Sequence, residues 1–343
     1  MIVLSLFNGM NTGRQALENI GIKVEKYYSS EIKTYAIELT QHHFSDTIQL
    51  GDINNWKDWN IETPDLILSG SPCQDLSIAG KRAGINGSRS GLFFVFIEIL
   101  EHFKKLNPDV LFLQENVGSA SKLDVGIMSR AMGLYPVRIN SKLVTAQLRD
   151  RYYWTNIKTK QSLFDTVTDI PQPKDRKIMF KDILENGFTD RDKAVAILES
   201  ESRIVVSQDS IKNRGNQNFI NMVYVEDNQV RVKTNTNSGY DVLSENDCLD
   251  LSFPTSTTRR GRVTKGKSPC LLEGNQPLYS LKDYQVRTVN QIEMERLQGF
   301  PDGYTSILSK AKAGSLLGDG WTLPIIEHIF KFIKHTKWNN QKE

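Results

Sequence analysis

The chain has 343 residues, which is enough for one large domain or for two unequal ones. Its hydrophobic fraction of 39% and charged fraction of 24% are typical of a globular protein, and no segment approaches the roughly 18 consecutive apolar residues of a membrane span. A net charge of +3 is too small to identify a nucleic-acid partner, so basic surfaces have to be sought locally.

The N-terminal segment from Met1 to Phe7 is apolar, but it lacks the basic start and small-residue cleavage site of a signal peptide. We therefore expect it to form a buried strand, and we expect no membrane association and a cytoplasmic protein. The three cysteines Cys73, Cys248 and Cys270 lie far apart and form no C-x-x-C pair. This spacing argues against a disulfide framework and against a structural zinc site, and we expect no metal.

Strand-like apolar runs alternate with helical patterns through the first 160 residues. The expected strands are 2–7, 24–30, 65–69, 110–114, 137–144 and 152–157, and the expected helices are 12–20, 32–43, 91–105 and 124–132. This alternation predicts an open, mostly parallel α/β sheet with helices on both faces. Ligands of such sheets bind beyond the carboxyl ends of the strands, so the loops that follow strands are the candidate sites.

The composition changes after about residue 160. The tripeptide Pro171-Gln172-Pro173 indicates a linker, and polar residues and glycine dominate from about 185 to 285, where we expect a helix at 193–202 and short strands at 221–226 and 229–233. Helical patterns return at 290–298 and in an apolar segment at 322–333 that can pack back on the first domain. The predicted domains are therefore 1–165, an irregular inserted domain at 166–300, and a C-terminal segment at 301–343.

Two chemically reactive side chains follow predicted strands. Cys73 lies after strand 65–69 among small residues and proline, where a thiolate could act as a nucleophile, although the position alone also allows a buried structural cysteine. Glu115 ends the strand 110–114, so we expect it on the same edge of the sheet. A thiol and a carboxyl group on one edge indicate covalent catalysis assisted by an acid.

A nucleoside site is indicated by the loops after the first three strands. Glycines in the loop from Phe7 to Gly13 allow a ligand to approach the backbone at the start of a helix. Glu31 ends the second strand, where a carboxylate can accept hydrogen bonds from ribose hydroxyls. Asp52 and Ile53 follow at the next turn and offer an acceptor and an apolar wall for an adenine.

Six motifs, in order, resemble those of the DNA cytosine-C5 methyltransferase family over nearly its whole catalytic domain. They are Ser5-Leu6-Phe7-Asn8-Gly9-Met10-Asn11-Thr12-Gly13, Gly70-Ser71-Pro72-Cys73-Gln74, Glu115-Asn116-Val117, Gln147-Leu148-Arg149-Asp150-Arg151, Arg287-Thr288 with Glu295-Arg296-Leu297-Gln298-Gly299-Phe300-Pro301, and Gly318-Asp319-Gly320-Trp321. The endings Thr12-Gly13 and Gly320-Trp321 resemble the animal de novo branch. The compact length and the spacer composition are more similar to bacterial or phage enzymes.

The resemblance implies a Rossmann-like S-adenosylmethionine-dependent methyltransferase sheet with a smaller, irregular inserted target-recognition domain. It implies methylation of C5 of cytosine in a specific sequence of double-stranded DNA, with the target base flipped out of the stack. The Cys73 thiolate would attack C6, and Glu115 would hold the N3/N4 edge of the base. Arg151 would contact O2, and Arg149 would orient a phosphate or the loop of the site.

The resemblance also implies S-adenosyl-L-methionine as the cofactor. The residues that would bind it are Phe7, Asn8, Gly9, Thr12, Gly13, Glu31, Asp52, Ile53, Pro72, Leu92, Asp319 and Trp321. Asn8 and Asp319 depart from the residues most common at these places in the family, but both changes are mild.

Two basic segments are candidates for DNA contact. The segment 77–91, which follows the nucleophile motif, contains Arg82 and Arg89 among glycines, and a run without acidic residues contains Arg259, Arg260 and Arg262. Basic side chains there would contact phosphates, and the second run would belong to the base-reading region. The alternatives are a plain exposed linker and a solvated basic surface.

Three alternative functions have to be weighed against DNA methylation. Cytosine methylation in transfer RNA uses the same motifs, but there the nucleophile motif usually continues with Pro-Phe, whereas Asp75-Leu76-Ser77 follows here. An inactive regulatory DNA-binding relative would be expected to have lost Cys73 or Glu115. A Rossmann-type oxidoreductase would carry a dinucleotide fingerprint that is missing here. We expect a monomer, and the sequence leaves open the recognition sequence, the host and whether a cognate restriction endonuclease accompanies the enzyme.

Overall fold

The structure is a computed structural model that describes residues 1–71, 91–185, 192–195, 223–226, 229–233, 236–244, 247–250, 262–265 and 289–333. Contacts divide the chain into two compact units. The first unit comprises Met1–Val144, Arg149–Asp175 and Asp319–Glu343, and the second comprises Thr145–Leu148 and Arg176–Gly318. In sequence, the second unit therefore interrupts the first.

The first unit contains a seven-stranded sheet with the strand order β3-β2-β1-β4-β5-β8-β6. Its strands are β1 Ile2–Leu6, β2 Lys26–Ser30, β3 Ile48–Gln49, β4 Leu66–Ser69, β5 Leu111–Val117, β6 Val137–Asn140 and β8 Asp150–Thr155. Strands β1 to β5 are parallel, and β8 is antiparallel to its two neighbours β5 and β6. The prediction of an open, mostly parallel α/β sheet is confirmed.

The strand order reverses at β1. The chain proceeds from β1 to β2 and β3 on one side, and then crosses to β4 and β5 on the other side. The carboxyl ends of β1 and β4 flank this reversal, and they are level with each other because Leu6 pairs with Ser69. Open α/β sheets bind ligands at such a reversal, beyond the carboxyl ends of the strands.

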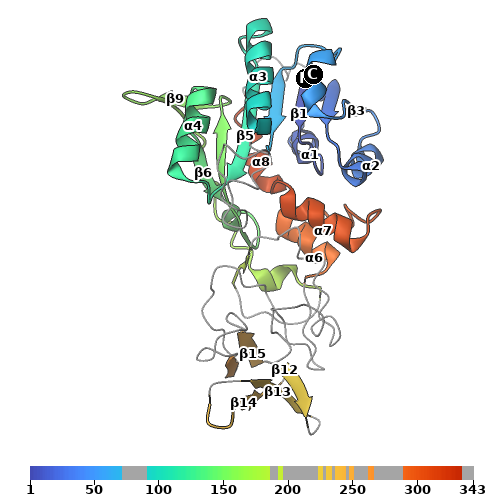
Figure 1. Ribbon diagram of the computed structural model, residues 1–343, viewed down its shortest axis with the longest axis vertical. Helices are drawn as coiled ribbons and strands as arrows, with labels where there is room; N and C mark the ends of the chain where they lie inside the picture. The colour runs from blue at the N-terminus through green and yellow to red at the C-terminus, as the bar shows by residue number, and fades with distance from the viewer. Residues whose placement is uncertain are drawn as a thin grey trace. The chain divides into compact units, whose positions relative to one another are not determined.

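Helices cover both faces of the sheet (Figure 1). Side chains alternate between the two faces along each strand, so both faces present apolar side chains that helices can cover. Leu4, Ile67 and Phe112 belong to one core cluster with α3 Gly91–Leu106 and α4 Lys122–Met132. On the opposite face, α1 Thr12–Asn19 approaches β4 closely, because a Cβ atom added to Gly13 would lie 2.3 Å from Leu68 Cδ1. The short α2 Thr34–His43 precedes the edge strand β3.

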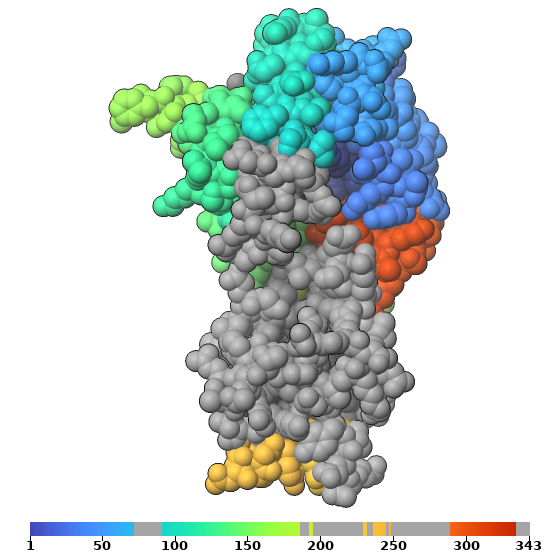
Figure 2. Space-filling model, in the orientation of Figure 1, coloured from blue at the N-terminus to red at the C-terminus, as the bar shows by residue number. Residues whose placement is uncertain are grey.

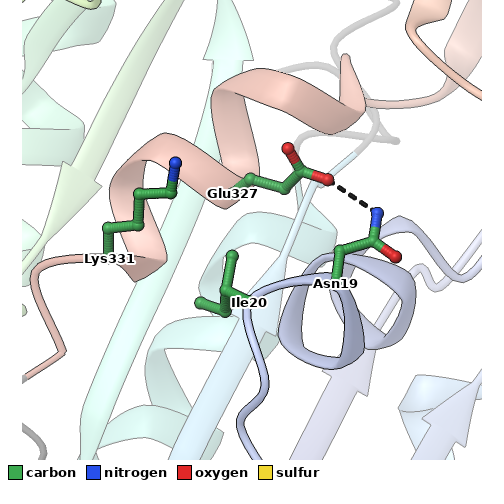
Figure 3. Close-up of a pocket in the computed structure, with 4 residues that line it drawn as sticks. All are labelled: Asn19, Ile20, Glu327 and Lys331. Atoms are coloured by element: carbon green, nitrogen blue, oxygen red, sulfur yellow. Dashed lines mark hydrogen bonds between the residues drawn. The ribbon is translucent and has the colours of Figure 1, made fainter.

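The C-terminal helix α8 Leu323–Phe330 packs against α1. Asn19 Nδ2 donates a hydrogen bond to Glu327 Oε1 at 2.6 Å, and these residues line a small surface pocket together with Ile20 and Lys331 (Figure 3). The apolar periodicity at 322–333 therefore corresponds to a helix of the first unit. A hairpin of β9 Thr159–Gln161 and β10 Thr166–Thr168 projects from the surface of this unit (Figure 1 and Figure 2).

The second unit consists of short elements. Parallel β7 Gln147–Leu148 and β11 Ala194–Val195 form one pair, and β12 Val223–Glu226, β13 Gln229–Lys233 and β14 Tyr240–Val242 form an antiparallel sheet. Antiparallel β15 Asp247–Asp250 and β16 Arg262–Lys265 form another pair. The helical part contains η4 Phe180–Ile183, α6 Gln291–Gln298 and α7 Lys310–Asp319. Its buried residues include Met294, Leu297 and Phe300.

Three predicted elements need correction. The helix expected at 193–202 is wrong at its start, because Ala194 and Val195 form β11 beside β7, and residues 196–202 lie outside the described residues. The strand expected at 137–144 ends at Asn140, whose side chain caps the 3-10 turn η3 Ser141–Leu143. The strand expected at 110–114 continues to Val117, because β8 pairs with it along that length. Within the described ranges, no helix is long and apolar enough to cross a membrane.

Candidate active site

The ends of three neighbouring strands bring the candidate residues together. Leu6 of β1 pairs with Ser69 of β4, and Ser69 pairs with Gln114 of β5. The loop that starts at Phe7, the loop that starts at Gly70 and the side chain of Glu115 therefore lie along one edge of the sheet. This is the edge at which the strand order reverses, and open α/β sheets bind their ligands at such an edge.

Glu115 lies inside β5 rather than at its end, and it is only 9% exposed. Its carboxylate is held by two side chains from distant parts of the sequence. Arg151 Nε lies 2.8 Å from Oε1, and the Trp321 indole Nε1 donates to Oε2 at 3.1 Å. A buried carboxylate is expensive unless it is paired and hydrogen-bonded, and both conditions are met here.

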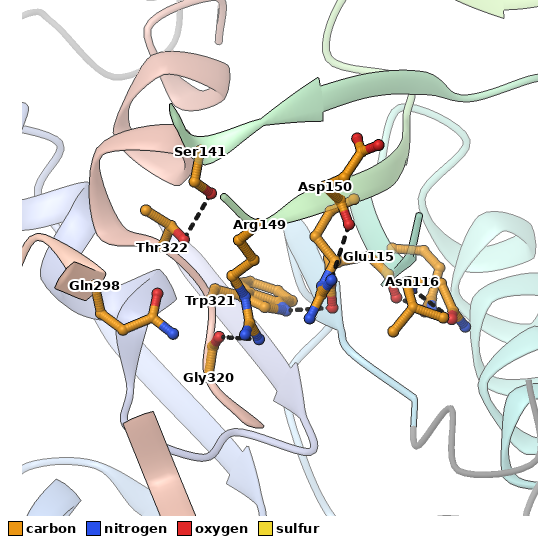
Figure 4. A network of polar contacts seen from close by, with 12 residues as sticks. Glu115, Asn116, Ser141, Arg149, Asp150, Gln298, Gly320, Trp321 and Thr322 are labelled. Carbon is orange, nitrogen blue, oxygen red and sulfur yellow. Dashed lines mark hydrogen bonds and ion pairs between the residues drawn. The ribbon is translucent and has the colours of Figure 1, made fainter. Parts of the chain in front are cut away.

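Arg149 is also buried, and it holds the backbone next to Trp321 (Figure 4). Its Nη2 donates to the carbonyl oxygen of Gly320 at 2.9 Å. Burial, and then the neighbouring charge of Arg151, lower the pKa of Arg149 to about 10, so the guanidinium is still charged at neutral pH. Of the two roles predicted for Arg149, the contact with Gly320 favours orientation of the loop.

The nucleophile motif is described only as far as Ser71. Gln114 Nε2, which is completely buried, donates to Ser71 Oγ at 3.1 Å and to the backbone oxygen of Glu115 at 2.8 Å. One side chain therefore connects the loop after β4 to the acid in β5. Pro72 and Cys73 lie outside the described residues, and Ser71 precedes Cys73 by two positions.

The loop after β1 has an unusual backbone. Phe7, Gly9 and Asn11 all have left-handed conformations, with φ of 57°, 57° and 61°. The side chain of Asn8 anchors this loop, because its Nδ2 donates to Thr40 Oγ1 and its Oδ1 accepts from the Tyr27 hydroxyl, both at 3.2 Å. Backbone amides also hold the loop, because Asn8 N–H donates to the Ser30 carbonyl at 3.3 Å and Asn11 N–H donates to the Asn8 carbonyl at 3.1 Å.

Glu31 connects this loop to the end of β2. Its Oε2 accepts from the backbone N–H of Gly9 at 2.8 Å, and its Oε1 accepts from the amides of Ile32 and Lys33. Asp52 follows β3 and caps the 3-10 helix η1 Ile53–Asp58 through Oδ1, which accepts from Asn54. Both carboxylates, and the buried side chain of Ile53, therefore follow β2 and β3, the two strands on one side of β1.

The start of α1 has the features of a site for a polar ligand. Asn11 is 0% exposed, and neither its Oδ1 nor its Nδ2 has a hydrogen-bond partner among the residues described here. Its side chain does not cap α1. A buried amide without partners is costly, so the site favours a ligand that brings both a donor and an acceptor. The amino-acid end of S-adenosylmethionine carries both groups, and thus these residues fit that cofactor.

The remaining candidates are distributed around the site. Asp319 Oδ2 pairs with Lys33 Nζ at 2.8 Å, and Leu92, near the start of α3, packs against the core cluster. Thr12 is buried at the start of α1. Of the predicted DNA-contacting residues, Arg82, Arg89, Arg259 and Arg260 lie outside the described residues, and Arg262 begins β16 without a description of its side chain. The pocket at Asn19 lies at the opposite end of α1 from this site.

The comparison that decides the family is a match of the model for "C-5 cytosine-specific DNA methylase" to residues 1–335. The chain belongs to this family. The predicted resemblance is confirmed, and the enzyme is a DNA (cytosine-5) methyltransferase of an S-adenosylmethionine-dependent family that acts on DNA.

Two relatives cover nearly the whole methyltransferase. Orphan methyltransferase M.SPRI of Bacillus phage SPR is 24% identical over 439 residues, which cover 99% of each chain. Type II methyltransferase M.HpaII of Haemophilus parainfluenzae is 27% identical over 344 residues, which cover 96% of this chain and 88% of that one. The solved structure of the Entamoeba histolytica methyltransferase EhMeth matches 97% of each chain with a TM-score of 0.59 at 14% identity. The sheet is therefore the Rossmann-like sheet of these methyltransferases.

Sequence reasoning missed three contacts of the methyltransferase site. It did not single out Gln114, although a glutamine in an otherwise apolar strand is itself a signal of a buried polar network. It gave no role to Lys33, which lies two residues after Glu31 and pairs with Asp319. It placed Trp321 beside the cofactor, and no sequence signal indicated the contact between its indole and Glu115.

Proposed function

We propose that this methyltransferase transfers a methyl group from S-adenosylmethionine to C5 of cytosine in a specific duplex sequence, through a covalent bond between Cys73 and C6. The observation that carries this proposal is the carboxylate of Glu115, held by Arg151 and Trp321 at the strand edge where the nucleophile loop begins. The target cytosine would be flipped out of the stack, because a duplex hides C6 from a side chain.

The chemical role of Cys73 follows from the low nucleophilicity of C5. Addition of the thiolate to C6 removes the aromaticity of the ring and makes C5 enamine-like. Ser71, two residues before Cys73, is bonded to Gln114 beside the acid, which supports a thiol and a carboxyl group acting on one base. In the completed cycle the C5 proton is lost and the Cys73 thiolate is expelled, which restores the C5–C6 double bond.

Glu115 and Arg151 would bind neighbouring atoms on one edge of the flipped base. Glu115 holds the proton at N3 and accepts from the N4 amino group, which withdraws electrons from C6 while the thiolate adds. Arg151 engages Glu115 through Nε and the carbonyl of Asp150 through Nη1. A guanidinium has five N–H groups, so donors remain for O2 of the cytosine.

The cofactor, when bound, supplies an electrophilic methyl group on its sulfonium. Glu31 would hold the ribose hydroxyls, Asp52 the adenine amine, and Ile53 the face of the adenine ring. The loop from Phe7 to Gly13 would hold the amino-acid end, where the unpartnered amide of Asn11 supports the assignment. The other proposed contacts are Pro72, Leu92, Asp319 and Trp321.

The remaining assignments concern the DNA and the organisation of the chain. We propose the target-recognition domain at residues 166–300, most of which belong to the second unit, with the catalytic domain at 1–165 and a C-terminal segment at 301–343. Arg82, Arg89, Arg259, Arg260 and Arg262 would contact DNA. We expect a monomer that works in the cytoplasm of a bacterium or phage-infected cell, where its DNA substrate lies. A cognate restriction endonuclease would share its recognition sequence.

Methyl transfer to DNA tests the proposal directly. The purified enzyme is incubated with duplex DNA of mixed sequence and S-adenosylmethionine with a labelled methyl group, and 5-methylcytosine is mapped at base resolution. We expect label in one short sequence context and none with Cys73→Ser. Cys248→Ser and Cys270→Ser are the matched controls, and both should retain the wild-type rate.

A parallel reaction with transfer RNA separates the alternatives. Label in transfer RNA and not in DNA would contradict the proposed substrate. Label in neither nucleic acid, from protein that still binds DNA, would instead support an inactive regulatory relative. Label in DNA that survives Cys73→Ser would contradict the covalent mechanism.

A further inference from the structure

The contact between Trp321 and Glu115 joins two motifs that lie 206 positions apart in the sequence (Figure 4). Trp321 was expected to be a wall of the cofactor site, and an apolar ring is sufficient for that role. Its indole N–H is nevertheless bonded to Glu115 Oε2. Trp321 is half-buried, and its indole N–H is used on a defined partner, so the contact specifies an orientation as well as a volume.

The residues on both sides of Trp321 are hydrogen-bonded to residues that flank strands β6 and β8. The carbonyl of Gly320 accepts from Arg149 at 2.9 Å, and the hydroxyl of Ser141 donates to Thr322 Oγ1 at 2.8 Å in a buried position. The indole also lies tightly against Gly70, because a Cβ atom there would be 2.8 Å from Nε1. Three separate contacts therefore hold the indole N–H where it meets the acid.

The hydrogen bonds of Glu115 leave a defined set of free acceptors. An ionised carboxylate has about four lone-pair positions, two on each oxygen. Arg151 occupies one position on Oε1, and Trp321 occupies one on Oε2. Among the contacts of the described residues, one position is left on each oxygen. A cytosine that is protonated at N3 presents two parallel donors, N3–H and N4–H, which match a carboxylate that is free on both oxygens and fixed in its plane.

We propose that Trp321 is a positioning residue for the acid. Its N–H fixes the second oxygen of Glu115, so that the carboxylate plane is set for the two-donor edge of the flipped cytosine before the base arrives. Without this bond, Arg151 holds one oxygen only, and the carboxylate can rotate about its terminal torsion. This inference rests on the proposed function, because it assigns the acid to the cytosine edge.

Trp321→Phe tests the inference, because phenylalanine keeps an aromatic ring but removes the N–H. We expect the single-turnover rate of methyl transfer to fall about 10- to 100-fold, which is the range for a hydrogen bond to a charged group. The dissociation constants for S-adenosylmethionine and for DNA should stay within about twofold. Trp59→Phe is the matched control, because Trp59 Nε1 has no partner in the part of the chain that the structure describes. Its rate should equal that of the wild type.

The indole N–H signals in a ¹H–¹⁵N NMR spectrum provide a second readout that needs no change at Trp321. The chain has five tryptophans, and the Trp321 signal is assigned by its loss in Trp321→Phe. Glu115→Gln should move this signal upfield, because an amide is a weaker acceptor than a carboxylate. The signal of Trp154, whose indole donates to Ser129 Oγ at 3.0 Å, should not move.

Two results would overturn the inference. One is an unchanged rate in Trp321→Phe while the wild type is active, and the other is a weakened affinity for S-adenosylmethionine with an unchanged rate, which would make Trp321 a cofactor wall only. Failure of the proposed function has a different signature, because the wild type would then transfer no methyl group to DNA. In that case an unmoved Trp321 signal in Glu115→Gln would still contradict the contact itself.

Discussion

At the scale of single residues, the site is built from buried polar groups that satisfy one another across long stretches of sequence. Glu115 is paired with Arg151, and Arg149 supports the backbone beside Trp321. Removing one member of such a network leaves its partner buried and unpaired, which costs more than the pair contributes. We therefore expect substitutions here to lower the free energy of unfolding as well as to disturb the geometry of the acid.

Gly70→Ala is the sharpest prediction at this scale. The new Cβ atom would lie 2.8 Å from Trp321 Nε1, so the indole or the loop has to move. We expect overpacking to lower the free energy of unfolding by about 1–3 kcal/mol. We also expect the rate of methyl transfer to fall in protein that is still folded. Urea denaturation and the initial rate measure the two effects.

The matched control for this prediction is Gly126→Ala. Gly126 lies inside α4, and the nearest atom to an added Cβ is Arg130 Nη1 at an ordinary 3.6 Å. An alanine inside a helix should raise the free energy of unfolding by about 0.5–1 kcal/mol. If Gly70→Ala behaved like this control, the close contact between Gly70 and Trp321 would be refuted.

At the scale of elements, much of the sheet can be predicted from apolar runs, and the errors have physical causes. The strand predicted to stop at Gln114 continues through Glu115 and Asn116, because pairing with β8 and the contacts of Arg151 and Trp321 make buried polar residues acceptable there. Helix α7 at 310–319 was not predicted, since its buried face consists largely of small residues such as Ala313, Gly314 and Ser315.

The turn after α6 allows a prediction about pH. Arg296 Nε donates to Asp302 Oδ1 at 2.7 Å, and this bond lowers the pKa of the Asp302 carboxyl group. The pair therefore stabilises the fold above the unfolded pKa of roughly 3.9, and the contribution is lost as pH falls through the lower folded value. Because both side chains are partly exposed, Asp302→Asn should cost less than about 1 kcal/mol at pH 7.

Denaturation at two pH values checks this prediction. The difference between Asp302→Asn and the wild type should shrink once the pH falls below the unfolded pKa of roughly 3.9, and it should also shrink in high salt at pH 7. Asp109→Asn is the control, because the exposed Asp109 carboxylate has no partner within the described ranges, and it should show no difference at either pH. A difference for Asp302→Asn that persisted at low pH would contradict the assigned ion pair.

At the scale of the whole molecule, the candidate site combines loops after β1, β2, β3 and β4 with residues of β5, β8 and the segment before α8. Because the parallel strands end at one edge of the sheet, the loops that follow them can be predicted from the sequence to lie near one another. The sequence is not sufficient to predict how they touch. The contacts of Trp321 with Glu115 and of Arg149 with Gly320 join positions 206 and 171 residues apart, and no local pattern encodes them.

A covalent trap with a modified base is the decisive test of the proposed bond between Cys73 and C6. Duplex DNA that carries the mapped recognition sequence is prepared with 5-fluorocytosine at the target. C5 then carries fluorine in place of hydrogen, so no proton can be lost from C5 after methylation and the Cys73 thiolate cannot be expelled. We expect an adduct that survives denaturation, requires S-adenosylmethionine, and is located at Cys73 by peptide mass spectrometry. Methylation of ordinary DNA without any such adduct, or an adduct at Cys248 or Cys270, would contradict the proposed covalent mechanism.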